Sequence, residues 1–256
     1  MDLGLKDRVY VVTGATRGLG HAAARELVAD GAKVVVTGRD EKRAADVVAE
    51  LGPNAVGAAV DNADPSAPER LIAIARERFG GFDGILVSVG GPPAGFVADN
   101  TDEHWQAAFE SVFLGAVRLA RAAAAELEDG GVIGFVLSAS VHEPIPGLTI
   151  SNGLRPGLAG FAKSLADELG PRGIRVVGLL PSRIDTDRVR ELDTMSADPQ
   201  ATRAEHESRI PLRRYGTAAE FGRVAAFLVF RAAWEVKGVI VPEGWGVSDG
   251  VYRGWV

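Results

Sequence analysis

The chain reads TGATRGLG from Thr13 to Gly20, and this stretch decides the fold. It directly follows the apolar run Val9–Val12 and leads into a helical pattern in which Leu19, Ala23 and Leu27 share one face. Glycines in a turn between a strand and a helix let the backbone approach a ligand, and the free N–H groups at the helix start attract phosphate. The stretch therefore predicts a phosphate-binding turn, and a dinucleotide is the first ligand that it indicates.

A glycine-rich turn can also join a strand to a helix without binding a ligand, so its surroundings decide between the two interpretations. Gly31 ends the helical stretch, and Val34–Val36 follows it as a second strand. This βαβ context favours the dinucleotide-binding interpretation.

Short apolar runs alternate with longer helical stretches along the whole chain. The runs are continuous rather than alternating in polarity, as expected of parallel strands that are buried on both faces. The predicted strands are Val9–Val12, Val34–Val36, Ala55–Val60, Ile85–Val87, Val132–Leu137, Ile174–Leu180 and Val239–Val241. The predicted helices include Glu41–Leu51, Pro68–Phe79, Asp102–Leu127, Leu158–Leu169 and Ala218–Phe230. The pattern predicts a single α/β domain over residues 1–256, with a doubly wound, Rossmann-type parallel sheet of seven strands flanked by helices.

Composition limits the classes of function. The chain has 256 residues, of which 46% are hydrophobic and 24% charged, as in an ordinary globular protein. Its net charge of −6 and the lack of a Lys/Arg-rich run argue against binding to nucleic acid or anionic membranes. The absence of cysteine excludes disulfides, thiolate catalysis and cysteine metal sites, and we expect no metal. With no membrane-length apolar run and no signal-peptide layout at the start, we expect a cytoplasmic protein.

The region 181–215 is the least regular part of the sequence. It is long, polar and charged, which suits a mobile flap over a substrate site. A passive surface excursion would have the same composition, so both interpretations stay open.

The end of the second strand indicates which dinucleotide is bound. An acidic residue there binds the ribose 2′-hydroxyl of NAD, whereas a basic residue receives the 2′-phosphate of NADP. Here the strand ends in Thr37-Gly38-Arg39, and Arg17 of the glycine-rich turn can reach the same phosphate. Two guanidiniums on one phosphate allow bidentate hydrogen bonds. Alternatively, both arginines are solvated and Asp40 neutralises Arg39. The sequence favours NADP(H) over NAD(H).

Further motifs extend over nearly the full length of the chain. They are Thr13–Gly20, Asp61-Asn62, Leu86–Gly91, Ser138, Leu180–Thr186 and Ile210–Gly216. Together they resemble the short-chain dehydrogenase/reductase family, in particular its β-ketoacyl (acyl carrier protein) reductase branch. The resemblance implies that Asp61 binds adenine, that the Gly90-Gly91 turn lines the cofactor, and that Thr186 meets the nicotinamide carboxamide. The residues predicted to bind the cofactor are Thr13, Gly14, Thr16, Arg17, Gly18, Leu19, Gly20, Arg39, Asp61, Asn62, Gly90, Gly91, Pro181, Ile184 and Thr186.

The same resemblance implies a catalytic set of Asn, Ser, Tyr and Lys, and here the chain departs from it. The corresponding positions hold Val112, Ser138, Ser151 and Arg155, so one of the usual groups remains. The turn Gly90–Pro93 and the Ser-Asn…Arg pattern resemble those of a divergent subgroup. We predict Ser138, Ser151 and Arg155 as the catalytic residues.

The replaced side chains change the chemistry that is available. A serine hydroxyl is a much weaker acid than a phenol, although Ser151 can donate a hydrogen bond to a developing oxyanion. Arg155 stays protonated and can supply charge but no proton, and Val112 breaks an asparagine-anchored proton relay. His142 and Glu143 are the nearest titratable candidates for a replacement acid, unless they are simply solvated loop residues.

Three further expectations concern packing. Pro156 disfavours helical geometry at Arg155, so we expect Ser151 and Arg155 at a helix start or a kink. The resemblance implies a homo-oligomer, a tetramer or dimer, built through the Ala- and Leu-rich helices. The tryptophans near the C-terminus would cover the site or fill a subunit interface; they are Trp234, Trp245 and Trp255.

Two functions remain in competition. The first is an NADP(H)-dependent oxidoreductase with a reworked proton donor, which transfers hydride between the nicotinamide and a ketone, alcohol or 3-oxoacyl-type substrate. The second is a catalytically inactive NADP(H)-binding sensor or assembly protein. An intact phosphate site without the usual tyrosine is expected under both.

Overall fold

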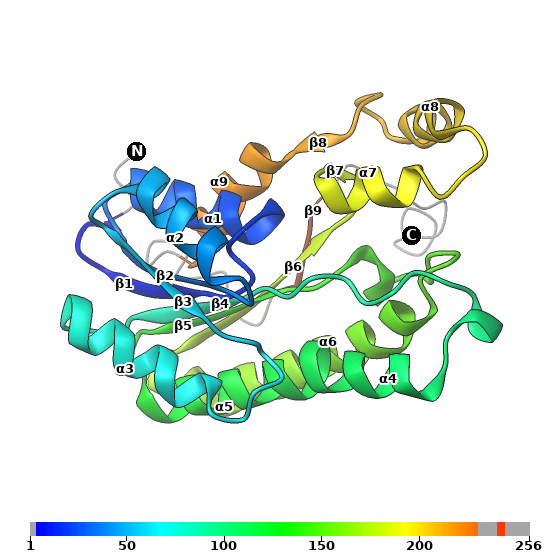
Figure 1. Ribbon diagram of the computed structural model, residues 1–256. Helices are drawn as coiled ribbons and strands as arrows, with labels where there is room; N and C mark the ends of the chain where they lie inside the picture. Colours follow the sequence, from blue (N-terminus) through cyan, green and yellow to red (C-terminus); the bar gives the residue numbers. More distant parts are fainter. Residues whose placement is uncertain (1–3, 230–239, 244–256) are drawn as a thin grey trace.

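The computed structural model describes residues 4–229 and 240–243, and its centre is one parallel β-sheet (Figure 1). The strands of the sheet are β1 (Val9–Val12), β2 (Lys33–Gly38), β3 (Ala55–Ala59), β4 (Gly84–Val87), β5 (Val132–Val136), β6 (Arg175–Pro181) and β9 (Ile240–Glu243). They lie in the order β3-β2-β1-β4-β5-β6-β9, and every neighbouring pair is parallel. The predicted doubly wound Rossmann-type fold is confirmed.

Helices cover both faces of the sheet (Figure 1). One layer holds α1 (Gly18–Ala29), α2 (Glu41–Leu51) and α9 (Ala218–Val229), and the other holds α3 (Ala67–Phe79), α5 (Gly115–Glu126) and α6 (Thr149–Leu169). In β1, Val9 and Val11 join the core under the second layer, whereas Tyr10 and Val12 join the core under the first. Successive side chains of a strand point to opposite faces, so a continuous apolar run fills both cores.

The predicted helix Asp102–Leu127 is divided in the structure. It consists of α4 (Asp102–Ala108), a π-helical segment (Phe109–Leu114) and α5. A side chain at Gly115 would collide with the backbone carbonyl oxygen of Asn62, so this glycine lets the helix approach the loop after β3. A π segment of this kind is common at functional sites.

The helix α6 begins at Thr149, well before the predicted start at Leu158, and Pro156 lies inside it. Ser151 therefore lies in the first turn, and Arg155 lies within the helix rather than at its start. The side chain of Asn152 ties the first turn of α6 to the preceding loop. It accepts a hydrogen bond from the Ile145 N–H (3.0 Å) and donates one to the Ile145 carbonyl oxygen (2.9 Å).

The region 181–215 contains regular structure despite its polar sequence. It holds β7 (Ile184–Asp185), which pairs with β8 (Gly216–Thr217) just beyond the region, together with α7 (Asp187–Asp193) and α8 (Pro199–Arg209). These elements rise above the carboxyl end of the main sheet (Figure 1). The short 3-10 helices of the described chain are Val97–Asp99, Ala139–Val141 and Gly170–Arg172.

Some predictions fall on residues outside the described ranges. These residues are Phe230, Val239 and the three tryptophans Trp234, Trp245 and Trp255. Among the helices that the structure describes, none combines the length and the apolar character needed to cross a bilayer.

Candidate active site

The glycine-rich turn after β1 has the geometry that requires its glycines. Gly14 and Gly18 have φ angles of +56° and +59°, in the left-handed region that favours glycine. A Cβ at Gly14 would lie 2.7 Å from the Ser88 carbonyl oxygen, and one at Gly20 would lie 2.5 Å from the Gly14 carbonyl oxygen. The Arg17 side chain does not cap α1. The N–H groups of the first turn of α1 are therefore available to a phosphate.

A buried hydrogen-bond network links the ends of β1 and β4. The Thr13 hydroxyl donates to the Ser88 carbonyl oxygen (2.6 Å) and accepts from the Ser88 N–H (2.9 Å). The Asn62 amide nitrogen donates to the Thr13 hydroxyl oxygen at 3.3 Å. All three residues are buried. Thr13 and Asn62, both predicted cofactor residues, thus hold the floor of the cleft together.

The two arginines expected at the 2′-phosphate are both exposed. A terminal nitrogen of Arg17 lies 3.7 Å from a carboxylate oxygen of Glu191 on α7. Arg39 forms no ion pair with any residue that the structure describes. The Asp40 carboxylate caps α2 by accepting from the Arg43 N–H (3.1 Å), and it lies 3.5 Å from the Arg43 guanidinium. Asp40 therefore pairs with Arg43 and does not neutralise Arg39.

Other predicted cofactor residues follow the carboxyl ends of neighbouring strands. Asp61 is exposed and accepts a hydrogen bond from the Ala63 N–H (2.9 Å). Thr186 caps α7 and lies near the glycine-rich turn, because a Cβ at Gly18 would be 4.0 Å from its methyl group. The remaining ones stand in the exposed turn after β4 (Gly90 and Gly91), at the end of β6 (Pro181), in β7 (Ile184), and in the glycine-rich turn with α1 (Thr16 and Leu19).

Three serines lie around the end of β5 and the start of α6. The Ser138 hydroxyl oxygen accepts from the Ser140 N–H at 3.1 Å. The hydroxyl oxygens of Ser140 and Ser151 lie 3.3 Å apart, and both residues are buried. Ser140 is not among the residues that the sequence predicts to be catalytic. The structure makes it the hydrogen-bond partner of Ser151, and its position two residues after Ser138 in a short 3-10 turn was the available signal.

The Arg155 guanidinium is buried, with 5% of the residue exposed. It donates to the backbone carbonyl oxygens of Val136 (2.7 Å) and Val89 (3.4 Å), which lie at the ends of β5 and β4. Its Nε is buried without a hydrogen-bond partner, and no carboxylate of the described chain pairs with it. Burial lowers the pKa of Arg155 to about 10. The guanidinium therefore remains a fixed positive charge at neutral pH.

The other candidate positions offer no acid next to the serines. Val112 lies in the π segment and packs in a small apolar cluster with Ile150 and Leu154. His142 and Glu143 are exposed, and neither is hydrogen-bonded to a described serine of the site.

Polar contacts join α7 and α8 to Arg183, between β6 and β7, and to Tyr215, just before β8. Arg183 donates to the buried Asp193 carboxylate (3.2 Å) and lies 2.8 Å from Nε2 of His206. Because a guanidinium only donates, Nε2 accepts and the imidazole is neutral. Its Nδ1–H then donates to the Tyr215 hydroxyl (3.2 Å), which donates to Asp193 (3.1 Å). Burial and the Arg183 charge lower the pKa of His206, and burial raises that of Tyr215 to about 12.

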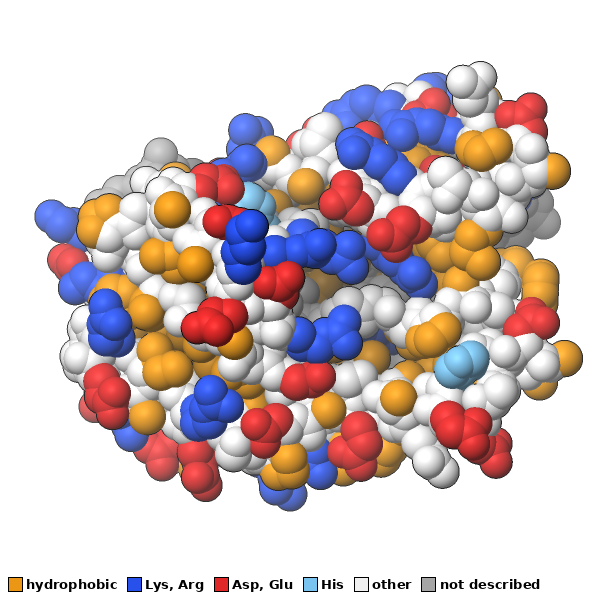
Figure 2. Space-filling view, in the orientation of Figure 1, with side chains coloured by type: hydrophobic (Ala, Val, Ile, Leu, Met, Phe, Trp, Pro, Cys, Tyr) orange, Lys and Arg blue, Asp and Glu red, His pale blue; other side chains and the backbone are white. Residues whose placement is uncertain are grey.

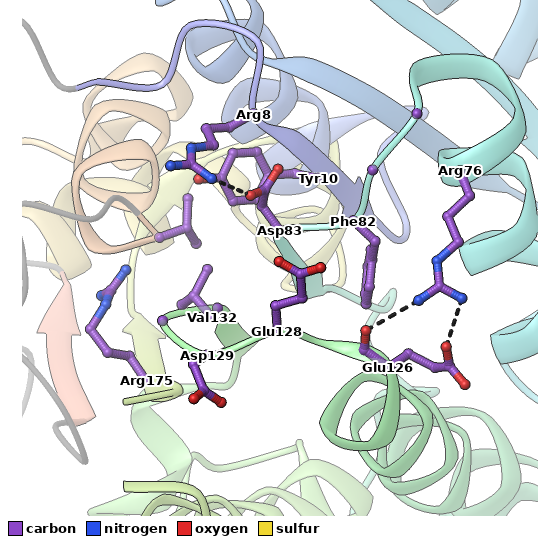
Figure 3. Close-up of a pocket in the computed structure, with 15 residues that line it drawn as sticks. Arg8, Tyr10, Arg76, Phe82, Asp83, Glu126, Glu128, Asp129, Val132 and Arg175 are labelled. Atoms are coloured by element: carbon purple, nitrogen blue, oxygen red, sulfur yellow. Dashed lines mark hydrogen bonds and ion pairs between the residues drawn. The ribbon is translucent and has the colours of Figure 1, made fainter. Parts of the chain in front are cut away.

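Basic side chains gather around the hollow beneath α7, on the face shown in Figure 2. A separate hollow of about 440 Å³ lies at the opposite, amino-terminal edge of the sheet (Figure 3). Within it Arg8 pairs with Asp83 (2.6 Å), and the buried Arg175 donates to the Leu228 carbonyl oxygen (2.7 Å). No residue predicted for the cofactor or for catalysis lines it. Among the described residues, no group of His, Cys, Asp and Glu is placed to hold a metal ion.

Comparisons with known proteins identify the family of this chain. A family model described as enoyl-(acyl carrier protein) reductase matches residues 14–248. Human dehydrogenase/reductase SDR family member 4 is 33% identical over 96% of the chain and 89% of the relative. The chain belongs to the short-chain dehydrogenase/reductase family.

Relatives in this family are oxidoreductases that are named for different substrates. L-rhamnose 1-dehydrogenase (NAD(P)(+)) of Azotobacter vinelandii is 33% identical, with 91% of this chain and 94% of the relative covered. The 3-oxoacyl-[acyl-carrier-protein] reductase FabG of Salmonella typhimurium is 32% identical over 98% and 99% of the two chains. The crystal structure of L-sorbose reductase from Gluconobacter frateurii, complexed with NADPH and L-sorbose, has a TM-score of 0.89 at 26% identity and covers 97% of this chain and 99% of its own. The short-chain dehydrogenase/reductase chain described here is thus related to hydride-transferring oxidoreductases.

Proposed function

We propose that this protein is an NADP(H)-dependent oxidoreductase that transfers hydride between the nicotinamide and a ketone, alcohol or 3-oxoacyl-type substrate. The observation that carries the cofactor assignment is Arg39 after β2, which pairs with no carboxylate of the described residues, since Asp40 beside it is used by Arg43. Arg17 supplies a second guanidinium from the glycine-rich turn. A short chain dehydrogenase from Burkholderia cenocepacia has a crystal structure in complex with NADP, which supports this assignment. It is 30% identical to this chain, with a TM-score of 0.86, and the match covers 95% of this chain and 98% of the other.

The residues at the carboxyl edge fit a dinucleotide. The left-handed glycines, the uncapped start of α1 and the two exposed arginines provide a phosphate site of the expected kind. Thr13–Gly20, Arg39 and Asp61 would hold the adenosine and phosphate portion, with Gly90-Gly91, Pro181, Ile184 and Thr186 along the rest. When bound, NADPH supplies the hydride.

The side chains of the site then orient the substrate carbonyl and stabilise the negative charge that develops on its oxygen. We propose that Ser138 and Ser151 donate hydrogen bonds to the carbonyl oxygen, which becomes negative as hydride arrives at carbon. Arg155 contributes a fixed positive charge behind them. Because neither serine nor arginine is a useful acid near neutral pH, the proton comes from water. The absence of a positioned general acid lowers the rate of the chemical step by about 10²- to 10⁴-fold. We therefore expect slow turnover.

A second candidate is a catalytically inactive NADP(H)-binding sensor or assembly protein. It is favoured by Val112, Ser151 and Arg155 at the positions where the family resemblance expects proton-transfer groups. Under this proposal the cofactor site is used for binding alone, and the buried serines have only a structural role.

One experiment separates the two candidates. NADPH binding is titrated by fluorescence, and NADPH oxidation is then followed by absorbance with a panel of ketones and acyl thioesters. We expect binding together with slow turnover that falls strongly in Ser138→Ala and Ser151→Ala. Tight binding without turnover across the panel would favour the sensor, and absence of NADPH binding would contradict both candidates.

We also propose that the protein works in the cytoplasm as a homo-oligomer, a tetramer or dimer, through α5 and α6. An exposed aromatic side chain next to α5 supports this, since Phe109 is 42% exposed and stacks on the partly buried Phe113 at a centroid distance of 5.4 Å. Light scattering coupled to size exclusion tests it: Phe109→Asp is expected to shift the mass toward the monomer.

A further inference from the structure

The positive charge of Arg155 is unbalanced within the described protein. Its guanidinium is held by two backbone carbonyl oxygens, and its Nε has no acceptor. A buried charge is costly unless an opposite charge or a complete set of hydrogen bonds compensates it. Carbonyl oxygens satisfy part of the hydrogen-bonding demand but carry no net charge. The end of β5 therefore attracts an anion.

The hydroxyls of Ser140 and Ser151 have one hydrogen that their mutual contact does not use. Ser140 and Ser151 carry two hydroxyl hydrogens, and their mutual contact at 3.3 Å uses one of them. The second is available to a ligand. Ser151 also lies in the first turn of the 21-residue helix α6, where the unsatisfied N–H groups carry partial positive charge. The hydroxyls and the helix start favour negative charge beyond the end of β5, and the Arg155 guanidinium reaches this end of the strand by donating to the Val136 carbonyl oxygen.

The surroundings strengthen this preference. Val112, Ile150 and Leu154 form an apolar cluster beside the serines. Exclusion of water by such a wall lowers the local dielectric constant, so charges interact more strongly there than in solvent. An alkoxide exists only while hydride is being transferred, whereas the charge of Arg155 is permanent. A permanent anion, such as a carboxylate that is ionised above about pH 4, matches it better.

We propose that Ser140, Ser151 and Arg155 form an anion subsite that takes the carboxylate of a 2-oxo acid. The inference rests on the proposed function, because the carbonyl next to this carboxylate must accept the hydride at the same edge of the sheet. For such a substrate Ser138 alone donates to the carbonyl oxygen, because the carboxylate uses the remaining hydrogen of the Ser140 and Ser151 pair. In the reaction, hydride from NADPH forms a C–H bond at the carbonyl carbon, the C=O π bond breaks, and water protonates the oxygen. The products are a 2-hydroxy acid, NADP⁺ and hydroxide.

The test compares two probes of equal size and different charge. Benzoylformate and its neutral amide are titrated into the NADPH-loaded protein, with the change in NADPH fluorescence as the readout. One charge-assisted interaction corresponds to a preference of about tenfold or more for the acid. In Arg155→Met the two probes are expected to bind equally, whereas Arg155→Lys keeps the preference. Arg172→Met is the matched control, because Arg172 also caps backbone carbonyls, those of Ala124 (2.7 Å) and Leu127 (2.5 Å), outside the cleft.

Serine variants keep the proposal testable if Arg155→Met does not fold. Ser140→Ala is expected to reduce the preference about threefold through loss of one hydrogen bond, and Ser164→Ala, on the exposed side of α6, is expected to leave it unchanged. An equal affinity for acid and amide in the wild type overturns the subsite. A preference for the acid that survives in Arg155→Met also overturns the subsite. A preference that disappears in Arg188→Met overturns it too, because Arg188 is the cation beside the Gly91 turn.

Failure of the subsite is distinguishable from failure of the proposed function. A protein that binds NADPH but does not prefer the acid contradicts only the subsite. A protein that does not bind NADPH contradicts the proposed function itself. The preference is also expected to stay constant between about pH 6 and 9, because Arg155 keeps its charge throughout. A preference that declines above about pH 7 would contradict the subsite, because it would require a cation that loses its charge in that range.

Discussion

Along the carboxyl edge of the sheet, the turns after β1, β2, β3 and β4 form the proposed cofactor half, whereas the turn after β5 and the start of α6 form the proposed substrate half. The cofactor half depends on backbone geometry, with the left-handed Gly14 and Gly18 and the buried Thr13 network. The substrate half depends on side-chain chemistry, with Ser151 and Arg155 in place of acidic groups. Cofactor binding can therefore persist while proton transfer changes.

The largest expected effect is a gain of activity in the substrate half. We expect Ser151→Tyr combined with Arg155→Lys to raise kcat by about 10²-fold, because a phenol next to an ammonium can act as a general acid. The NADPH dissociation constant is expected to stay within about twofold, as the cofactor half is unchanged. Each single substitution serves as a control. A double variant that binds NADPH normally but turns over no faster would contradict the assignment of these positions.

The next effect is a loss of stability in the cofactor half. We expect Thr13→Val to lower the free energy of unfolding by about 2–3 kcal/mol, because it leaves buried groups of Ser88 and Asn62 without their partner. Urea denaturation measures it. Thr37→Val is the matched control, since the Thr37 hydroxyl is equally buried but has no hydrogen-bond partner. That substitution is expected to be neutral or stabilising, and equal losses in both variants would count against the network.

The smallest effect concerns the polar contacts around His206. The pKa of His206 is lower in the folded protein than its ordinary value of 6.5, so the unfolded chain binds the proton more readily. The contribution of His206 to stability is therefore present above pH 6.5 and is lost as pH falls below it toward the folded pKa. The hydrogen bond from Arg183 is broken by protonation, at a cost of about 1 kcal/mol.

Urea denaturation at about pH 7.5 and 5.5 checks this sign. The wild type is expected to lose more stability on acidification than His206→Gln, which does not titrate. A larger acid loss in the variant would show that the imidazole is not neutral in the fold. NADPH affinity is expected to change equally in both proteins, because the contacts around His206 lie outside the cofactor half.

Sequence patterns predicted the sheet well because its strands are continuous apolar runs. They placed β1 and α2 at their observed ends. They missed the start of α6, since Gly153 and Pro156 weaken helix propensity, whereas the Asn152 clamp on Ile145 is a tertiary contact. The π segment after α4 was missed for the same reason, as it depends on the close approach at Gly115.

The candidate site divides in the same way. The glycine-rich turn and Arg39 could be identified from local order along the chain. The contact between Ser140 and Ser151 could not, because it joins a turn after β5 to a helix that begins several residues later. The unpaired burial of Arg155 also needed the structure, since a sequence does not show which carboxylates are near a guanidinium.

The ratio of NADPH to NADH affinity in the wild type, Arg39→Asp and Ser151→Ala tests the separation of the two halves most directly. We predict that Arg39→Asp weakens NADPH by about tenfold, the usual effect of losing one charged phosphate contact, without weakening NADH. Ser151→Ala is predicted to leave both affinities unchanged. Equal weakening of NADPH and NADH by Arg39→Asp, or loss of NADPH binding in Ser151→Ala, would contradict the account.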